Sequence, residues 1–306
     1  MLTFTSAGAV SRPRTVQIRV QRAYPGRIRA GAPVPTRSMD AAEIEQNLRF
    51  FTEGQKGPRK RPATTLVLSG VGVVSRPDTP ALLALARQLG LERIVLHCGT
   101  EDLETLDPSP FADAVDVLVL PVQPGPSGGS IAGTRAVRRC RDAGLPVASN
   151  TVLTAAAVPH VEAAARAIAS LGAGRHTFTW PFPIAGNSSG QVPGVRAAVR
   201  ALERAVPILE RAGVTVGVKG LPGCYIGGLS RLLWKSANRW YVDADHQCGD
   251  AVLFYPEVAR FHKDEACRFC RLDGRCDGFF STYLRRPGFP PLSPLPAEPV
   301  EDSQSG

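Results

Sequence analysis

The stretch TLVLSGVGVVSRPDTPALLALARQLGLERIVLHCG, residues 65–99, contains two short apolar segments on either side of a longer amphipathic one. TLVLSG (65–70) and RIVLHCG (93–99) have the length and β-branched content of buried strands. Between them, residues 79–90 predict a helix with Thr79 at its N-cap and a proline in its first turn. A strand, a helix and a second strand in this order predict a right-handed unit with two parallel strands.

The same alternation continues to about residue 222. TVQIRV (15–20) predicts a first strand, and Asp40 with Glu43 predicts a capping box at the start of a helix. Further strands are expected at 115–122, 146–153, 175–183 and 214–222, with helices at about 131–143, 158–172 and 195–212. About seven strands joined by helices predict an α/β fold with a parallel sheet, either a full or partial barrel or an open doubly wound sheet. In both forms, ligands bind at the carboxyl ends of the strands.

The composition is that of an ordinary globular protein. The chain has 306 residues, of which 43% are hydrophobic and 21% charged. No stretch approaches the length of apolar sequence that a membrane span needs, and the N-terminus does not resemble a signal peptide. We therefore expect a cytoplasmic protein without a membrane partner. The net charge of +9 comes from scattered arginines, so we expect a solvated basic surface and no nucleic-acid partner.

The clearest chemical signal is ACRFCRLDGRCDGFF (266–280), which places Cys267, Cys270 and Cys276 at C-x2-C-x5-C. Seven cysteines are an odd number in a long chain, which favours a metal or cluster site over a disulfide framework. Structural zinc and cubane clusters both need about four such ligands. Cys224 is our first candidate for the fourth ligand because it follows the last predicted strand. Cys248, with His246 nearby, is the second candidate, and the spacing alone allows either zinc or iron–sulfur.

Two parts of the chain resemble a known family. LPGC (221–224) and the segment from 239 to 292 are similar to the SPASM or twitch domain, the auxiliary-cluster extension of radical S-adenosylmethionine enzymes, with Gly278 and Tyr283-Leu284 at the matching places. The resemblance extends over about residues 15–290. It implies a partial (β/α)6 TIM-like barrel and a small C-terminal cysteine-rich domain. It also implies one auxiliary 4Fe–4S cluster, with zinc as the alternative, held by Cys224, Cys267, Cys270 and Cys276.

The sequence departs from this family where the radical chemistry begins. The family carries C-x3-C-x2-C after the first strand, whereas this chain has Tyr24, Ile28 and Gly31 at that spacing. Isoleucine and glycine side chains cannot ligate a cluster. The family's Gly-Gly-Glu is reduced to a degenerate motif in which only Gly70 and Gly72 remain to contact a cosubstrate. The resemblance therefore implies a degenerate homologue without catalytic residues, and we do not expect S-adenosylmethionine to bind.

The domain organisation follows from these patterns. We expect an N-terminal extension at 1–14, the degenerate barrel at 15–222, the iron–sulfur domain at 223–287 and a proline-rich flexible tail at 288–306. The tail should lie extended over the surface before it becomes disordered. Our first functional hypothesis is a non-catalytic partner of an active radical enzyme, or a subunit that binds a peptide or small-molecule substrate, in a biosynthetic pathway. The alternatives are a cofactor-binding or electron-transferring iron–sulfur enzyme and a structural-zinc module.

Three further groups contain residue types that can bind metals. His97 and Cys98 end a predicted strand, where they form either a ligand pair or a packed strand end. Cys140 lies in the middle of a predicted helix and should face the core. The sequence DADH, with Asp243, Asp245 and His246, resembles a metal cluster but is equally well explained as a polar turn.

Overall fold

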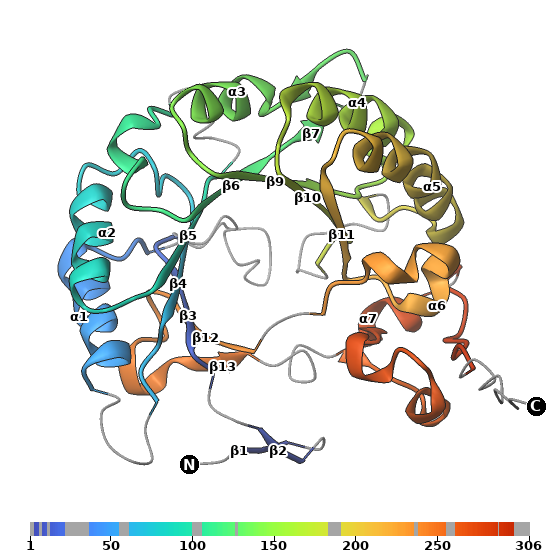
Figure 1. Ribbon diagram of the computed structural model, residues 1–306. Helices are drawn as coiled ribbons and strands as arrows, with labels where there is room; N and C mark the ends of the chain where they lie inside the picture. Colours follow the sequence, from blue (N-terminus) through green and yellow to red (C-terminus); the bar gives the residue numbers. More distant parts are fainter. Residues whose placement is uncertain are drawn as a thin grey trace, which may run out of the picture.

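The computed structural model describes residues 3–5, 8–10, 13–21, 37–54, 61–99, 106–125, 128–182, 191–235, 238–254, 261–286 and 288–296. A curved sheet forms the framework, and helices surround its outer face (Figure 1). The sheet bends around an interior space, as expected of a partial TIM-like barrel, so the predicted α/β fold class is confirmed. No helix in the described part of the chain is both long and apolar enough to cross a membrane.

All seven predicted strands are present, each shorter than the sequence suggested. They are β3 (Thr15–Arg19), β4 (Thr65–Ser69), β5 (Arg93–His97), β6 (Val117–Pro121), β9 (Val147–Val152), β10 (Arg175–Thr179) and β11 (Thr215–Lys219). Each strand pairs in parallel with the next in this series. Their carboxyl ends therefore meet at one mouth of the barrel, where parallel α/β folds place their ligands.

Two further strands extend the sheet beyond the predicted set. β12 (Arg239–Val242) pairs in parallel with β3, and β13 (Val252–Phe254) pairs antiparallel with β12. The full order is β11-β10-β9-β6-β5-β4-β3-β12-β13, so the sheet has nine strands where the sequence indicated about seven. β12, which lies in the part of the chain that we expected in the C-terminal domain, thus pairs with the edge of β3 that would otherwise lack backbone partners.

The outer layer consists of α1 (Ala41–Thr52), α2 (Thr79–Gln88), α3 (Thr134–Asp142), α4 (Val161–Leu171) and α5 (Val195–Arg211). The expected capping box is present at α1, where the Asp40 carboxylate accepts from the Glu43 N–H at 2.8 Å. In α2 the N-cap is Asp78, one residue before the predicted Thr79. The helix expected from residue 131 starts later because β8 (Ile131–Ala132) pairs with β7 (Gln123–Pro124).

The remaining elements are short. β1 (Thr3–Thr5) and β2 (Gly8–Val10) form an antiparallel pair within the N-terminal extension. Beyond β11 lie α6 (Gly223–Ile226), β14 (Phe261–His262), β15 (Phe279–Phe280) and α7 (Ser281–Leu284). Several 3-10 turns connect them: Ser109–Phe111, Val158–His160, Gly227–Leu232, Cys248–Asp250, Glu265–Phe269 and Asp273–Arg275.

An aromatic cluster joins the barrel to the C-terminal segment. Trp180, directly after β10, contacts the rings of Phe279, Tyr283 and Phe289 at centroid distances of 6.0, 6.3 and 6.2 Å. Trp180, Phe279 and Tyr283 are almost completely buried. Burial of aromatic rings of this size is among the largest contributions that single side chains make to a core. The cluster therefore fixes the cysteine-rich segment against the end of β10.

Candidate metal centre

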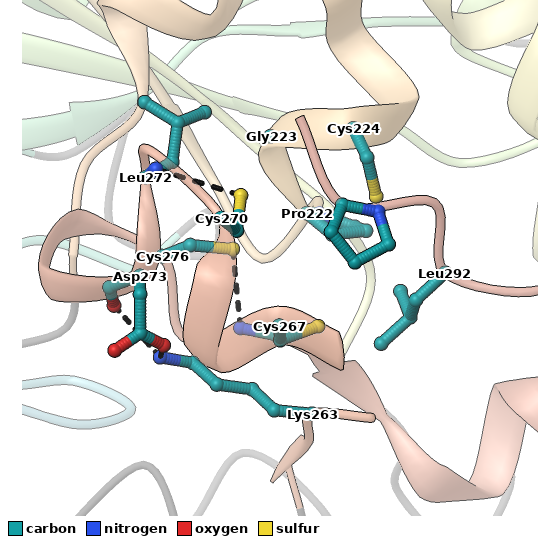
Figure 2. Close-up of a pocket in the computed structure, with 12 residues that line it drawn as sticks. Pro222, Gly223, Cys224, Lys263, Cys267, Cys270, Leu272, Asp273, Cys276 and Leu292 are labelled. Atoms are coloured by element: carbon teal, nitrogen blue, oxygen red, sulfur yellow. Dashed lines mark hydrogen bonds and ion pairs between the residues drawn. The ribbon is translucent and has the colours of Figure 1, made fainter. Parts of the chain in front are cut away.

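The four predicted ligands, which come from two distant parts of the chain, line one pocket (Figure 2). Cys224 lies on α6, which begins four residues after the end of β11. Cys267 lies in the 3-10 turn Glu265–Phe269, Cys270 directly follows this turn, and Cys276 follows the turn Asp273–Arg275. The fold thus brings the C-x2-C-x5-C segment beside the cysteine that we favoured as its fourth partner.

Backbone N–H groups point at two of the sulfur atoms. The Leu272 N–H donates to Cys270 Sγ at 3.5 Å, and the Gly278 N–H donates to Cys276 Sγ at 3.3 Å. Such hydrogen bonds stabilise negative charge on sulfur, which a thiolate ligand carries. Gly278 has a φ of +85°, and a Cβ at this position would lie only 2.1 Å from the His262 carbonyl oxygen. A glycine is therefore required for the turn that delivers this N–H.

The pocket raises the pKa of two of its thiols, Cys224 and Cys267. Burial raises the pKa of Cys224, and the neighbouring Cys276 and Cys267 raise it further because thiolates repel one another. Burial likewise raises the pKa of Cys267. A metal cation reverses this effect because it binds the thiolate directly. The Lys263 ammonium also lines the pocket, but it is already paired with the Asp273 carboxylate at 2.8 Å.

Apolar residues form the rest of the wall. Leu272 packs closely on Gly223: a Cβ added to Gly223 would lie only 2.4 Å from Leu272 Cδ1. Leu292 and Pro294, from the proline-rich tail, close another side. The Arg271 N–H donates to the Leu295 carbonyl at 3.0 Å and holds this part of the tail in place. Residues 288–296 of the tail thus pack beside the pocket, with Leu292 buried, and residues 297–306 lie outside the described part.

The four sulfur atoms surround the pocket without converging on a single point. Among the described residues, no group of three or more His, Cys, Asp or Glu side chains has the spacing of metal ligands. The donor set nevertheless fits a metal or cluster in its chemistry. It combines four cysteines in one apolar pocket with N–H donors aimed at two sulfurs. Four thiolates could each bind one iron of a cubane, or together bind one zinc ion.

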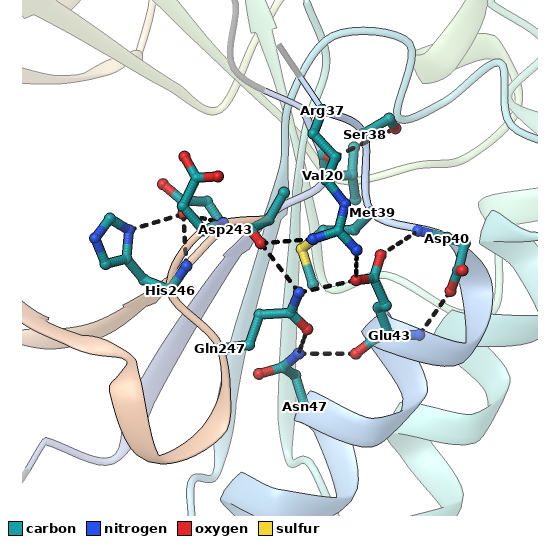
Figure 3. A network of polar contacts seen from close by, with 12 residues as sticks. Val20, Arg37, Ser38, Met39, Asp40, Glu43, Asn47, Asp243, His246 and Gln247 are labelled. Carbon is teal, nitrogen blue, oxygen red and sulfur yellow. Dashed lines mark hydrogen bonds and ion pairs between the residues drawn. The ribbon is translucent and has the colours of Figure 1, made fainter.

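Cys248 does not line this pocket; its backbone contacts α1 instead. It lies next to a polar network that joins α1 to the turn after β12 (Figure 3). The Cys248 N–H donates to Asn47 Oδ1 at 2.7 Å, and the Asn47 amide donates to Gln247 Oε1 at 3.0 Å. Gln247 in turn donates to Glu43 Oε1 at 3.0 Å, which is the main cause of the lowered pKa of Glu43. These contacts attach the turn after β12 to the first helix.

The DADH sequence forms a turn, one of the two roles that the sequence allowed. The buried Asp243 carboxylate accepts from the backbone N–H groups of Asp245 and His246 at 3.0 and 3.1 Å, and its Oδ1 lies 2.9 Å from His246 Nδ1. Cys140 is buried on the inner side of α3, as expected, and burial raises its pKa to about 11. A thiol with this pKa stays protonated and acts as a small apolar side chain.

His97 and Cys98 have different surroundings. Cys98 is buried, whereas His97, the last residue of β5, keeps part of its surface exposed. Desolvation by the surrounding protein atoms, and after it the positive charges of Lys219, Arg239 and Arg19, lower the pKa of His97 to about 4. This group of cations was not expected from the sequence. Arg19 and Lys219 each lie at the last position of a strand, which is a signal that the sequence offers, whereas Arg239 begins a strand that the sequence pattern did not predict.

Gly70 and Gly72, which we considered as weak candidates to contact a cosubstrate, lie in the turn after β4. Gly70 has a φ of +130°, and an added Cβ would lie 2.7 Å from the Gln21 nitrogen, so close backbone packing explains this glycine without a ligand. Gly72 also has a positive φ, but no atom lies within 4 Å of an added Cβ. Tyr24, Ile28 and Gly31, which occupy the spacing of the family's three cluster cysteines, lie outside the described residues.

Comparison with known proteins supports the fold. The sequence matches no protein-family profile and no curated protein. Streptococcus suis SuiB bound to S-adenosylmethionine has a TM-score of 0.59 and 10% identity, covering 90% of this chain and 74% of SuiB. Native anSMEcpe with bound AdoMet has a TM-score of 0.56 and 11% identity, covering 86% of this chain and 88% of anSMEcpe. A structure of SuiB bound to the precursor peptide SuiA has a TM-score of 0.58 and 10% identity, covering 90% of this chain and 73% of SuiB.

This likeness extends over most of both chains. It shows that the protein has the fold of these two proteins, both of which have S-adenosylmethionine bound. At 10–11% identity, the likeness concerns the fold alone.

Proposed function

We propose that this protein is a degenerate radical S-adenosylmethionine-like protein that holds one auxiliary 4Fe–4S cluster. In this role it would act as a non-catalytic partner, or as a substrate-binding subunit, of an active radical enzyme in a biosynthetic pathway. The observation that carries the proposal is the pocket that gathers Cys224 with Cys267, Cys270 and Cys276. The peptide-bound structures of SuiB and anSMEcpe make a peptide substrate a reasonable candidate for the same pathway.

The cysteine residues fit the cluster in number and in chemistry. When bound, a cluster of this kind supplies one-electron transfer at a potential set by its charge, its hydrogen bonds and its exposure to solvent. The chain's own contribution is to bind and orient the group. The Leu272 and Gly278 N–H groups stabilise thiolate charge, while Leu292 and Pro294 shield the pocket from water. A structural zinc ion could use the same four thiolates, and metal analysis distinguishes the two.

The non-catalytic role follows from the sequence of the N-terminal loop. Radical cleavage of S-adenosylmethionine needs a cluster with one open iron, and no cysteine precedes Cys98 in this chain. Purified, reconstituted protein incubated anaerobically with dithionite and S-adenosylmethionine should therefore form no 5′-deoxyadenosine. If 5′-deoxyadenosine forms in proportion to this protein and is lost in Cys267→Ala, the non-catalytic proposal is wrong. If it forms only with an added enzyme that has an intact C-x3-C-x2-C loop and binds this protein, the partner role is supported.

A further inference from the structure

The inner face of the barrel carries basic residues at the mouth. On β3, Val16 and Ile18 are fully buried in the core beneath the helices, so Arg19 points to the opposite face, which is the lumen. The same alternation on β11 places Lys219 on the lumen side, because its neighbour Val218 is fully buried. Both residues end their strands, and Lys219 occupies the carboxyl end where α/β barrels bind ligands.

Arg239 on β12 approaches the same space. Its neighbour Trp240 contacts Phe51 of α1 at a centroid distance of 5.6 Å, so Arg239 lies on the other face of the strand. Its positive charge acts on His97 and also on Lys219. Burial and then Arg239 lower the pKa of Lys219 to about 8. Arg239 is therefore close enough to Lys219 to repel it, and the charges of Arg19, Lys219 and Arg239, from three strands, all act on His97.

The described part of the barrel contains little negative charge to balance them. None of the eight parallel strands contains an aspartate or a glutamate. Asp277, next to Cys276, is the carboxylate that acts on Lys219. The Nε atom of Arg19 is buried and has no hydrogen-bond partner among the described residues. A buried donor without a partner is costly, so this guanidinium is arranged for a group that supplies an acceptor.

We propose that the barrel lumen binds a small organic anion with a carboxylate or phosphate group, held by Arg19 and Lys219 and supported by the charge of Arg239. This inference deepens the proposed function and rests on it, because it gives the chemistry of the substrate that the barrel would hold. Guanidinium groups bind both kinds of anion through paired N–H donors, and an ammonium adds a point charge. At neutral pH the His97 ring is uncharged and can donate or accept one hydrogen bond.

Isothermal titration calorimetry at low ionic strength tests the proposal, with inorganic phosphate and succinate as separate probes. We expect saturable binding of at least one probe at one site per chain, and the stronger probe identifies the class of anion. Arg19→Gln and Lys219→Gln should each weaken binding at least about tenfold, because each removes a charge-assisted hydrogen bond. Arg138→Gln, which removes an exposed charge on α3, is the matched control and should leave binding unchanged.

A thermal-shift measurement on the same variants guards against simple misfolding. Without anion, Lys219→Gln should melt at or above the temperature of the parent, because it relieves repulsion, but the probe should no longer raise that temperature. Absence of binding by both probes, or equal weakening by Arg138→Gln, would overturn the proposal. Iron and sulfide are measured in the same samples: no anion binding in cluster-loaded protein refutes the anion site alone, whereas intact anion binding in protein that cannot be loaded refutes the cluster alone.

Discussion

Replacing Tyr283 with phenylalanine tests how the cysteine-rich segment is attached to the barrel. The Tyr283 side chain is completely buried, and its hydroxyl donates to the Pro181 carbonyl at 2.8 Å. Its ring stacks on Phe289 at a centroid distance of 5.5 Å. Tyr283→Phe keeps the ring and its packing but leaves a buried carbonyl without its donor. We expect a loss of about 1–3 kcal/mol in the free energy of unfolding.

Thermal unfolding followed by tryptophan fluorescence measures this loss. At about 2 °C per kcal/mol, the expected decrease in Tm is about 2–6 °C for a chain of this size. Tyr225→Phe is the matched control, because the Tyr225 hydroxyl donates to the Pro290 carbonyl in an exposed contact where water can replace it. Its Tm should change by less than about 2 °C. An unchanged Tm in Tyr283→Phe, or an equal decrease in Tyr225→Phe, would show that the buried contact does not hold the segment.

Three further predictions concern the turns, the acid limit of stability and the ligands. Gly278→Ala should lower both Tm and iron content, because this glycine has a positive φ and no room for a Cβ, whereas Gly274→Ala should change neither. The buried ring of His176 has its pKa lowered to about 3 by burial, so the unfolded state takes up more protons below about pH 6.5. The contribution of the neutral His176 ring to the free energy of unfolding is complete above about pH 6.5. It is lost as the pH falls toward 3, by up to about 1.4 kcal/mol per pH unit. In His176→Gln, the free energy of unfolding measured by urea titration should therefore depend less on pH in this range. Cys270→Ala should abolish cluster absorbance, whereas Cys140→Ala should keep it and cost only stability.

The central strands and helices could be predicted because their signals are local. Short β-branched segments alternating with amphipathic helices define a parallel α/β fold, and β3 to β11 follow that pattern. β12 was missed because RWYV contains two large aromatic residues and an arginine whose positions make sense only beside β3. The packed start of the tail was missed because prolines usually indicate an extended, solvated chain, whereas here Leu292 is buried.

The spacing indicated Cys267, Cys270 and Cys276 as a group, and the place of Cys224 after the last predicted strand indicated it, rather than Cys248, as their neighbour. The four cysteines line one pocket, and their role as ligands stays a prediction. The cations of the lumen could not be recognised as a group from the sequence alone. Arg19 and Lys219 are 200 residues apart, and only closure of the sheet around a common interior brings their charges together with Arg239. Proximity of this kind depends on barrel curvature, which no local pattern encodes.

The most direct test of the account is iron, sulfide and zinc analysis of anaerobically reconstituted protein, with Cys224→Ala and Cys248→Ala prepared in parallel. The account predicts about four irons and four sulfides per chain, as one cubane requires. It also predicts loss of both in Cys224→Ala and retention in Cys248→Ala. Stoichiometric zinc without sulfide, or a cluster that is lost in Cys248→Ala and kept in Cys224→Ala, would contradict it.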